Sequence, residues 1–197
     1  MEERLRFLKR FLHSPSSVGS ITPSSSFLAK KMVKEEEVEP CLNIIELGAG
    51  TGVFTKHLMQ MKTSETKLYV FEKDPLMAAN LQRKYSDIKI FPDATQIGKL
   101  LNKGELSQTD LVISGLPFAV MPDSVRQKIL RGVFQVLRPG GKFVAFQYSF
   151  QLLKELERIY GCVDLEFVLL NIPPAVVYRC TKVADGVKKD WDERNIV

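Results

Sequence analysis

The sequence has few of the residues that fix a fold through cross-links or metals. Its 197 residues include three cysteines and two histidines. Cys41, Cys162 and Cys180 are odd in number and far apart, so we expect free thiols in a reducing compartment rather than disulfides or a zinc site. His13 and His57 have no partners at metal-ligand spacing, and the sequence therefore predicts no metal centre.

Long apolar runs are also absent. No segment approaches the ~18 to 20 apolar residues that a membrane-spanning helix needs. The N-terminal MEERLRFLKRFLHS has charges threaded through its apolar residues, unlike a signal peptide. The composition, 45% hydrophobic and 26% charged, is typical of a globular protein. We therefore expect a cytoplasmic protein with one main domain that folds around its own core.

Acidic residues are scarce at the N-terminal end. Residues 1–34 hold seven basic side chains and two acidic ones, a surplus equal to the net charge of +5 of the whole chain. Such a region is suited to an anionic partner, either membrane headgroups or nucleic acid. The alternative is an ordinary helix face in water.

The N-terminal region is predicted to hold two helices. LRFLKRFL (5–12) has apolar residues at helical spacing with basic residues between them, which indicates an amphipathic helix. A Pro/Ser/Gly stretch at 13–26 cannot form a long regular element. Its last serines, Ser24 to Ser26, are candidates to cap a helix over 27–37, and Pro40 ends that unit.

From residue 42 the sequence alternates between strand and helix patterns. Strands are predicted at 42–46, 67–72, 88–91, 110–115 and 142–148, and helices at 52–61, 75–85, 124–137 and 151–161. Two final strands, 164–170 and 175–182, are joined by NIPP, which suggests a hairpin. The pattern predicts an α/β, Rossmann-like fold with a mostly parallel seven-stranded sheet and an antiparallel C-terminal hairpin.

The stretch ELGAGTG (46–52) follows the first of these strands. Gly48, Gly50 and Gly52 allow a sharp turn and a close approach of backbone N–H groups to a ligand. In such sheets ligands bind at the carboxyl ends of the strands. Glu72 ends the second strand, 20 residues after Gly52, where a carboxylate can accept hydrogen bonds from ribose hydroxyls. The stretch therefore predicts a site for a nucleoside-containing cofactor.

The form E-x-G-x-G-x-G resembles the first motif of class I S-adenosylmethionine (SAM)-dependent methyltransferases, whereas dinucleotide sites usually read G-x-G-x-x-G. FEKDP (71–75), PDAT (92–95) and LRPGGKFV (137–144) match further features of that family in the same order. The resemblance implies SAM as cofactor, with Glu72 at the ribose and Asp93 at the adenine amino group. The cofactor-binding residues that it implies are Glu46, Gly48, Ala49, Gly50, Gly52, Glu72, Lys73, Asp93, Ala94, Ser114 and Gly115.

The acceptor of the methyl group is expected beside SGLPFAVMP (114–122), at the end of the fourth strand. Ribosomal RNA adenine dimethylases carry an N-L-P-Y type motif here, whose Asn accepts a hydrogen bond from the amino group of the flipped base. This chain has Leu116-Pro117-Phe118, but Gly115 stands where that Asn would be. Adenine is therefore a less favoured acceptor.

The same stretch is similar to that of the soluble bacterial phosphatidylethanolamine N-methyltransferases, with the pattern S-G-L-P and a second proline at Pro122. The similarity extends to FLHSPSSVGSITPSS (11–25), FQYS (146–149) and NIPPAVVYR (171–179), and covers about residues 5–182. It implies methylation of the amine of phosphatidylethanolamine and its methylated derivatives. It also implies a peripheral location at the inner face of the membrane.

That resemblance implies three regions. Residues 1–34 would form the substrate and membrane side, residues 35–183 the SAM-binding domain, and residues 184–197 a charged tail. The helix at 5–12 would lie in the headgroup layer, or it would pack its apolar face on the domain.

Candidate catalytic residues are Ser114 and three aromatic residues, Phe118, Tyr148 and Tyr178. Aromatic faces attract an amine that becomes a quaternary ammonium. The two tyrosines lie in predicted strands, where aromatic residues also simply fill cores. Two alternatives to a lipid enzyme stay open: a nucleic-acid methyltransferase of the rRNA dimethylase type, and a protein that methylates a small soluble amine or nothing.

Overall fold

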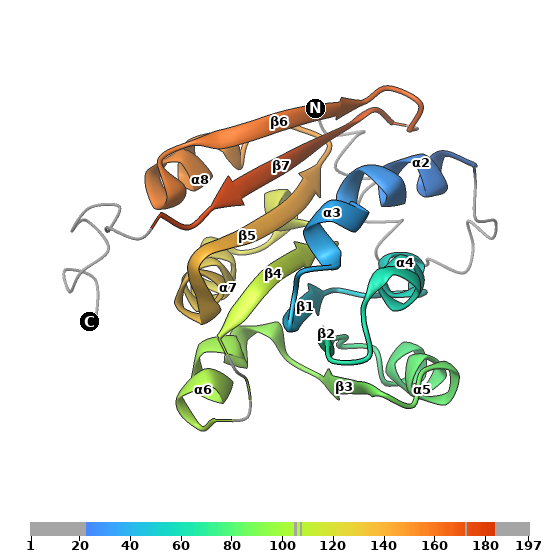
Figure 1. Cartoon of the computed structure of the whole chain (residues 1–197). Helices are drawn as coiled ribbons and strands as arrows, with labels where there is room; N and C mark the ends of the chain where they lie inside the picture. The colour runs from blue at the N-terminus through green and yellow to red at the C-terminus, as the bar shows by residue number, and fades with distance from the viewer. Residues whose placement is uncertain (1–22, 105, 107, 172, 184–197) are drawn as a thin grey trace.

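The structure is a computed structural model that describes residues 23–104, 106, 108–171 and 173–183 (Figure 1). The predicted helix at 5–12, most of the loop at 13–26 and the tail at 184–197 lie outside these residues. Within the described residues, helices pack on both faces of one central sheet (Figure 1).

The sheet has seven strands in the order β3-β2-β1-β4-β5-β7-β6. The strands are β1 (Asn43–Leu47), β2 (Lys67–Phe71), β3 (Ile88–Phe91), β4 (Thr109–Ser114), β5 (Leu137–Gln147), β6 (Val163–Val168) and β7 (Ala175–Thr181). The first five are parallel, whereas β7 pairs with β5 and with β6 in antiparallel register. The predicted fold class, including the C-terminal hairpin, is confirmed.

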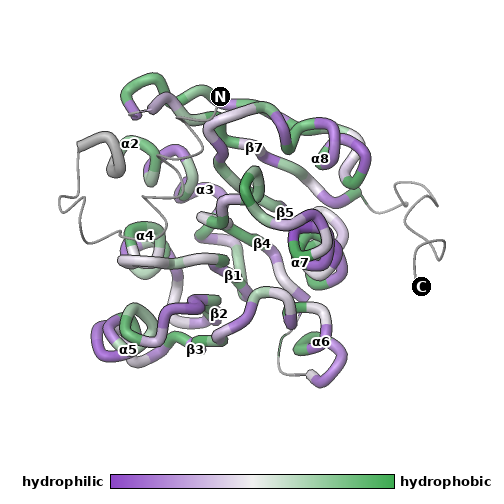
Figure 2. The backbone as a smooth tube through the Cα atoms, turned by 180° about the vertical axis from the view of Figure 1, so that it is seen from behind, coloured by the Kyte–Doolittle hydropathy of each residue, from purple (hydrophilic) through white to green (hydrophobic). Residues whose placement is uncertain are grey.

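The helices connect the strands. They are α2 (Pro23–Met32), α3 (Glu35–Val38), α4 (Val53–Met61), α5 (Pro75–Lys84), α6 (Ile97–Asn102), α7 (Asp123–Val136) and α8 (Leu153–Tyr160), with short 3-10 helices η1 (Ala94–Gln96) and η2 (Phe118–Val120). In Figures 1 and 2, α2 to α5 lie on one face of the sheet, and α6 to α8 lie on the other.

Each face of the sheet has its own core, because the central strands are apolar on both sides. Phe54, Leu58 and Leu81 of α4 and α5 are buried together with α2 residues against one face. The other face is covered by α7 and α8 through residues such as Leu130 and Leu156. Strands buried on both faces read as continuous apolar runs, as NIIEL and TDLVIS do here.

The structure corrects three details of the predicted elements. The single helix expected over 27–37 is two helices, α2 and α3, separated at residues 33 and 34. The backbone of α2 begins at Pro23, so Ser24 to Ser26 lie in its first turn rather than at the cap, and Pro at the first helical position suits its fixed φ. The η1–α6 segment was not predicted, because its ATQIGKLLN pattern is too short to show a period.

Candidate active site

Three loops meet at the carboxyl ends of β1, β2 and β4. Leu47 pairs with Phe71 of β2 on one side and with Ser114 of β4 on the other, so the three strands end at the same level. The chain passes from β1 to β2 on one side and places β4 on the other. Such a reversal of strand order leaves a crevice at the strand ends where ligands bind in open α/β sheets.

The loop after β1 is held in a tight turn. Gly48 and Gly50 have φ of 72° and 55°, in the left-handed region that favours glycine. The Gly48 N–H donates to the carbonyl of Phe71 at 2.8 Å, which fixes the loop to β2. A Cβ on Gly48 would lie 2.7 Å from Leu116 Cδ2, whereas one on Gly50 would meet no atom of the described residues within 4 Å. The turn is therefore closed toward the β4 loop and open at Gly50.

Glu72 reaches from the end of β2 to this open part of the turn. Its Oε2 accepts a hydrogen bond from Gly50 N at 2.6 Å, and its Oε1 accepts one from Asp74 N at 2.8 Å. Asp74 in turn caps α5 by accepting from Leu76 N and Met77 N. A carboxylate has about four lone-pair positions, so Glu72 retains capacity for two more donors. Lys73, the next residue, is exposed.

Glu46 is the carboxyl group beneath the turn. Its side chain is fully buried, and Oε2 accepts a hydrogen bond from the Thr55 hydroxyl at 2.7 Å. Oε1 has no hydrogen-bond partner among the residues that the structure describes. Burial raises the pKa of Glu46 to about 7, with a smaller upward contribution from Glu72, and the Thr55 hydrogen bonds oppose the shift. A buried, half-satisfied carboxyl group under a ligand crevice is a candidate functional group.

Asp93 lies at the end of β3 and caps η1. Its carboxylate accepts hydrogen bonds from Thr95 N and Oγ1, both at 2.8 Å, and from Gln96 Nε2 at 3.2 Å. Burial alone would raise its pKa, but the Thr95 and Gln96 hydrogen bonds lower it overall. Asp93 is therefore an ionised acceptor at the third strand end, and Ala94 follows it half-buried.

The Leu116-Pro117 segment packs directly on the glycine turn. Gly115 N donates to the Leu47 carbonyl at 2.8 Å, and a Cβ on Gly115 would lie 2.8 Å from the Gly48 carbonyl oxygen. Such an approach leaves no room for a side chain. The glycine that the sequence shows in place of the rRNA dimethylase Asn is thus required by the packing of two loops.

Gln147 holds the far side of the same segment and was not singled out from the sequence. Its Nε2 donates to the Leu116 carbonyl at 3.0 Å, and its Oε1 accepts from Ala119 N at 3.2 Å. The residue is 4% exposed. The sequence signal for Gln147 was a single amide side chain at the end of the apolar run KFVAFQ, because buried polar side chains usually have hydrogen-bond partners.

Three of the four predicted catalytic residues are buried in the structure. Phe118 is fully buried and packs edge-on against Phe143. Tyr178 is also fully buried, and its hydroxyl donates to the Ser149 carbonyl at 2.6 Å. Ser114 is buried, and its Oγ accepts from Leu116 N at 3.2 Å. Both rings are part of the core, and a role for Phe118 and Tyr178 around the substrate stays a prediction.

Tyr148 is the candidate that stays beside the crevice. It follows the last residue of β5 and is half-buried, with its ring 5.7 Å from that of Phe146 in an edge-on arrangement. Burial raises the pKa of Tyr148, and a hydrogen bond with Asn171 opposes the shift. Its hydroxyl is therefore neutral at physiological pH and able to donate or accept a hydrogen bond.

No group of three or more metal-ligating side chains occurs among the described residues. The residues present do fit a nucleoside carrying a sulfonium. A Cβ on Gly50 would enter open space at the turn, Glu72 has free acceptor capacity there, and Glu46 has an unpartnered buried oxygen. Ala49 and Gly52 complete the turn, with the Gly52 N–H donating to the Ala49 carbonyl at 2.9 Å.

Comparisons with known proteins agree with this arrangement. Residues 44–141 match the family model described as a methyltransferase domain. The chain is 29% identical over 191 residues to an ornithine lipid N-methyltransferase of Singulisphaera acidiphila, covering 94% of this chain and all of that protein. It is 25% identical over 134 residues to the ribosomal RNA small subunit methyltransferase A of Thermotoga neapolitana, covering 66% of this chain and 48% of that protein.

A solved structure of similar fold is the T. thermophilus 16S rRNA N2 G1207 methyltransferase RsmC in complex with AdoMet and guanosine. It has 23% sequence identity and a TM-score of 0.63, and the match covers 85% of this chain and 45% of that one. At this identity the similarity concerns the fold alone. The sequence motifs, the open glycine turn with its two carboxylates, the sheet order and the matching methyltransferase domain lead to one conclusion: the chain is a SAM-dependent methyltransferase.

Proposed function

We propose that the enzyme methylates the amine of a lipid headgroup, with phosphatidylethanolamine and its methylated derivatives as substrates, while bound peripherally to the inner face of the membrane. The observation that carries this proposal is the similarity to a lipid N-methyltransferase along that protein's full length. None of the described helices is long and apolar enough to cross a membrane. The enzyme would therefore meet its lipid at the surface.

Different residues of the crevice would bind different parts of SAM. Gly50 N and the Glu72 carboxylate would hold the ribose side of SAM, Asp93 and Ala94 its adenine, and Glu46 its amino-acid end. When bound, SAM supplies a methyl group on a positively charged sulfur, a leaving group that needs no protonation. The protein's task is then to align the acceptor nitrogen and to remove its proton.

The acceptor side would be formed by the Leu116-Pro117 segment and Tyr148. Gln147 fixes the Leu116 carbonyl by a hydrogen bond, so the segment keeps one position relative to the glycine turn. The Tyr148 ring offers a face to an ammonium group, an attraction of about 0.5–2 kcal/mol. Its neutral hydroxyl, beside Asn171, would hydrogen-bond to the amine, and the amine proton would pass to water.

Methylation of ribosomal RNA is a second candidate, favoured by the 25% identity to the Thermotoga neapolitana enzyme. Two features oppose it. The Gly115 position is too tightly packed for the Asn of the N-L-P-Y motif, and Phe118 is buried instead of available to stack on a base.

One experiment separates the candidates. The purified full chain is incubated with methyl-labelled SAM and, in parallel, with phosphatidylethanolamine vesicles, ornithine lipid vesicles, ribosomal RNA or buffer. We expect label in phosphatidylethanolamine. Label in ornithine lipid alone would keep lipid N-methylation but refute the phosphatidylethanolamine substrate. Label in RNA and in neither lipid would refute the proposal.

A further inference from the structure

Exposed apolar side chains gather where the β6–β7 hairpin meets α2. Leu169 and Leu170, in the loop between the two strands, are 75% and 66% exposed, and Phe27 of α2 is 45% exposed. Three lysines of the same helix region, Lys30, Lys31 and Lys34, line one groove of about 450 Å³ together with Phe27, Leu169 and Leu170. We call these six residues the hairpin surface.

The hairpin loop buries a polar side chain and exposes apolar ones, the reverse of an ordinary surface loop. Its polar residue Asn171 is 5% exposed, and the Asn171 side chain donates to the Pro173 carbonyl at 2.8 Å. The leucines beside it project outward, and Figure 2 shows hydrophobic colouring at this end of the hairpin. The loop conformation thus keeps two large apolar side chains in water, as expected of an interaction site.

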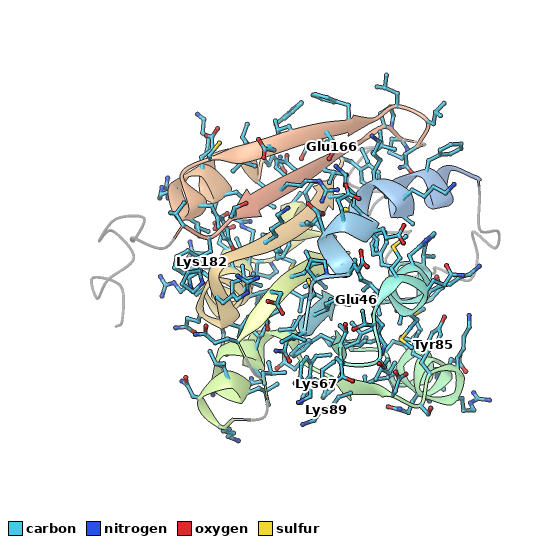
Figure 3. The ribbon with its side chains drawn as sticks, viewed as in Figure 1. Glu46, Lys67, Tyr85, Lys89, Glu166 and Lys182 are labelled. Atoms are coloured by element: carbon cyan, nitrogen blue, oxygen red, sulfur yellow. The ribbon has the colours of Figure 1, made fainter. Side chains whose placement is uncertain are left out.

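The charge of the hairpin surface is positive. Lys31 and Lys34 pair with Glu166 of β6 at 3.3 and 2.6 Å, and Glu166 also pairs with Arg179. Figure 3 shows Glu166 on the side of β6 near α2. Among the described residues, Lys30 forms no ion pair. Glu166 is shared by Lys31, Lys34 and Arg179, and Arg179 also pairs with Glu37, so the positive charge that remains beside the exposed leucines is chiefly that of Lys30.

The hairpin surface lies at the same edge of the sheet as the crevice. β7 is antiparallel to β5, so Val176 at the start of β7 pairs with Gln147 at the end of β5. Gln147 is the residue that holds the Leu116-Pro117 segment. The loop before β7 is therefore on the carboxyl side of the parallel strands, where the acceptor must enter.

We propose that the hairpin surface docks on an anionic phospholipid bilayer, with Leu169 and Leu170 inserted among the headgroups and the lysines facing lipid phosphates. Apolar residues flanked by lysines are the composition of interfacial membrane-binding segments. Docking at this edge places the crevice toward the membrane. This inference rests on the proposed lipid substrate for its purpose, although its binding step does not require methyl transfer.

Two other occupants suit the charges less well. Residues 1–22, which precede α2, contain four basic and two acidic side chains, and the lysines would repel a basic segment. A second copy of the chain would bring two positive hairpin surfaces together. An anionic bilayer complements both the hairpin surface and the basic N-terminal residues.

The test is co-sedimentation of the full chain with vesicles, without SAM. Vesicles of phosphatidylethanolamine and phosphatidylglycerol are compared with vesicles of phosphatidylcholine alone. We expect preferential binding to the anionic vesicles, weakened at least fivefold by Leu169→Ser and about fivefold by Lys30→Gln. The matched controls are Leu42→Ser and Lys67→Gln. Leu42 is also exposed, at 60%, and Figure 3 shows Lys67 well away from Glu166. Thermal melting checks that each variant is folded.

Each outcome decides the proposal. Equal loss of binding in the control variants, or no loss with Leu169→Ser and Lys30→Gln, would overturn the hairpin surface as the docking site. Failure of the unaltered chain to bind anionic vesicles would overturn it as well. A chain that binds vesicles through these residues but transfers no methyl group to lipid would leave the docking site standing and refute the proposed substrate.

Discussion

At the scale of single residues, the crevice depends on carboxyl groups in three different environments. Glu72 is half-buried and accepts two backbone N–H groups, Asp93 caps a 3-10 helix, and Glu46 is buried with one free oxygen. Hydrogen bonds to the charged form keep Asp93 ionised, whereas burial favours the neutral form of Glu46. The three carboxyl groups therefore differ in protonation and in hydrogen bonding, and each can serve a different role in the crevice.

Removal of the Glu72 carboxylate is expected to weaken SAM binding. Glu72→Ala loses the group that reaches Gly50 N and the acceptor capacity beside it, so we expect at least a tenfold higher Kd, about 1.4 kcal/mol. Isothermal titration calorimetry measures the change. Glu65→Ala, at an exposed position, serves as control. An unchanged Kd for Glu72→Ala would show that Glu72 does not bind the cofactor.

Glu46 is expected to make stability depend on pH. Its folded pKa, about 7, lies above its ordinary value of 4.5, so its contribution is fully present below pH 4.5 and is lost as pH rises through 7. The full effect is on the order of 3 kcal/mol. In Glu46→Gln this dependence is removed, and the variant should gain thermal stability relative to the unaltered chain between pH 5 and 8. A difference in Tm that stays constant over that range would contradict the prediction.

At the scale of elements, the site is a contact between two loops. The glycine turn after β1 and the segment after β4 approach until the Gly115 Cα faces the Gly48 carbonyl, and the Gln147 side chain from β5 braces the second loop. The sequence predicted both loops. It did not show that they can pack this closely only because each has a glycine at the contact.

A side chain at position 115 is therefore expected to separate the loops. Gly115→Asn places Cβ 2.8 Å from the Gly48 carbonyl, and overpacking of this kind costs about 1–3 kcal/mol. We expect lower Tm together with at least fivefold weaker SAM binding, and no gain of adenine methylation. Gly104→Ala is the control, because it has positive φ but open space around it. It should lower Tm and leave SAM affinity unchanged; the same result for Gly115→Asn would refute the loop contact.

The amphipathic segment at 5–12 is a further element, outside the described residues. If it lies in the headgroup layer, Phe7→Ser with Phe11→Ser removes apolar area that contributes about 25 cal/mol per Å² buried. We expect at least tenfold weaker binding to anionic vesicles with SAM affinity within twofold of the unaltered chain. Reduced SAM affinity with normal vesicle binding would instead support packing of the helix on the domain.

Much of the architecture was predictable because the strands are short, apolar and bounded by turn residues. The strand IKIF was predicted at its observed limits, and the strand NIIEL and the helix from Pro75 to within one residue. The aromatic residues of the acceptor side were not predictable in the same way. Phe118 and Tyr178 are residue types that also occur in ligand sites, yet their burial depends on segments distant in sequence. Phe143 packs against Phe118, and the Ser149 carbonyl accepts from the Tyr178 hydroxyl.

At the scale of the whole molecule, three lysines lie beside the hairpin, on the side that carries the crevice. Lys30, Lys31 and Lys34 flank the hairpin, and the residues before them carry most of the chain's remaining excess of basic side chains. Long-range attraction to an anionic surface would orient the enzyme before any lipid is bound.

Binding to vesicles should therefore weaken with salt. The Debye length falls from ~10 Å at 0.1 M to ~3 Å at 1 M ionic strength, so we expect at least a tenfold loss of vesicle binding over that range. SAM affinity, which depends on short contacts in the crevice, should change by less than twofold. Salt-independent sedimentation would mean that insertion of apolar side chains alone holds the enzyme on the vesicle.

The position of β7 has a consequence for biosynthesis. This strand is the last of the seven to leave the ribosome, but it lies inside the sheet, between β5 and β6. Until it is inserted, β5 remains an open sheet edge with unpaired backbone groups, and β6 has no partner among the other strands. The last strand of the nascent chain must therefore insert between two strands that are synthesised before it. Aggregation is most favoured in the interval before this insertion.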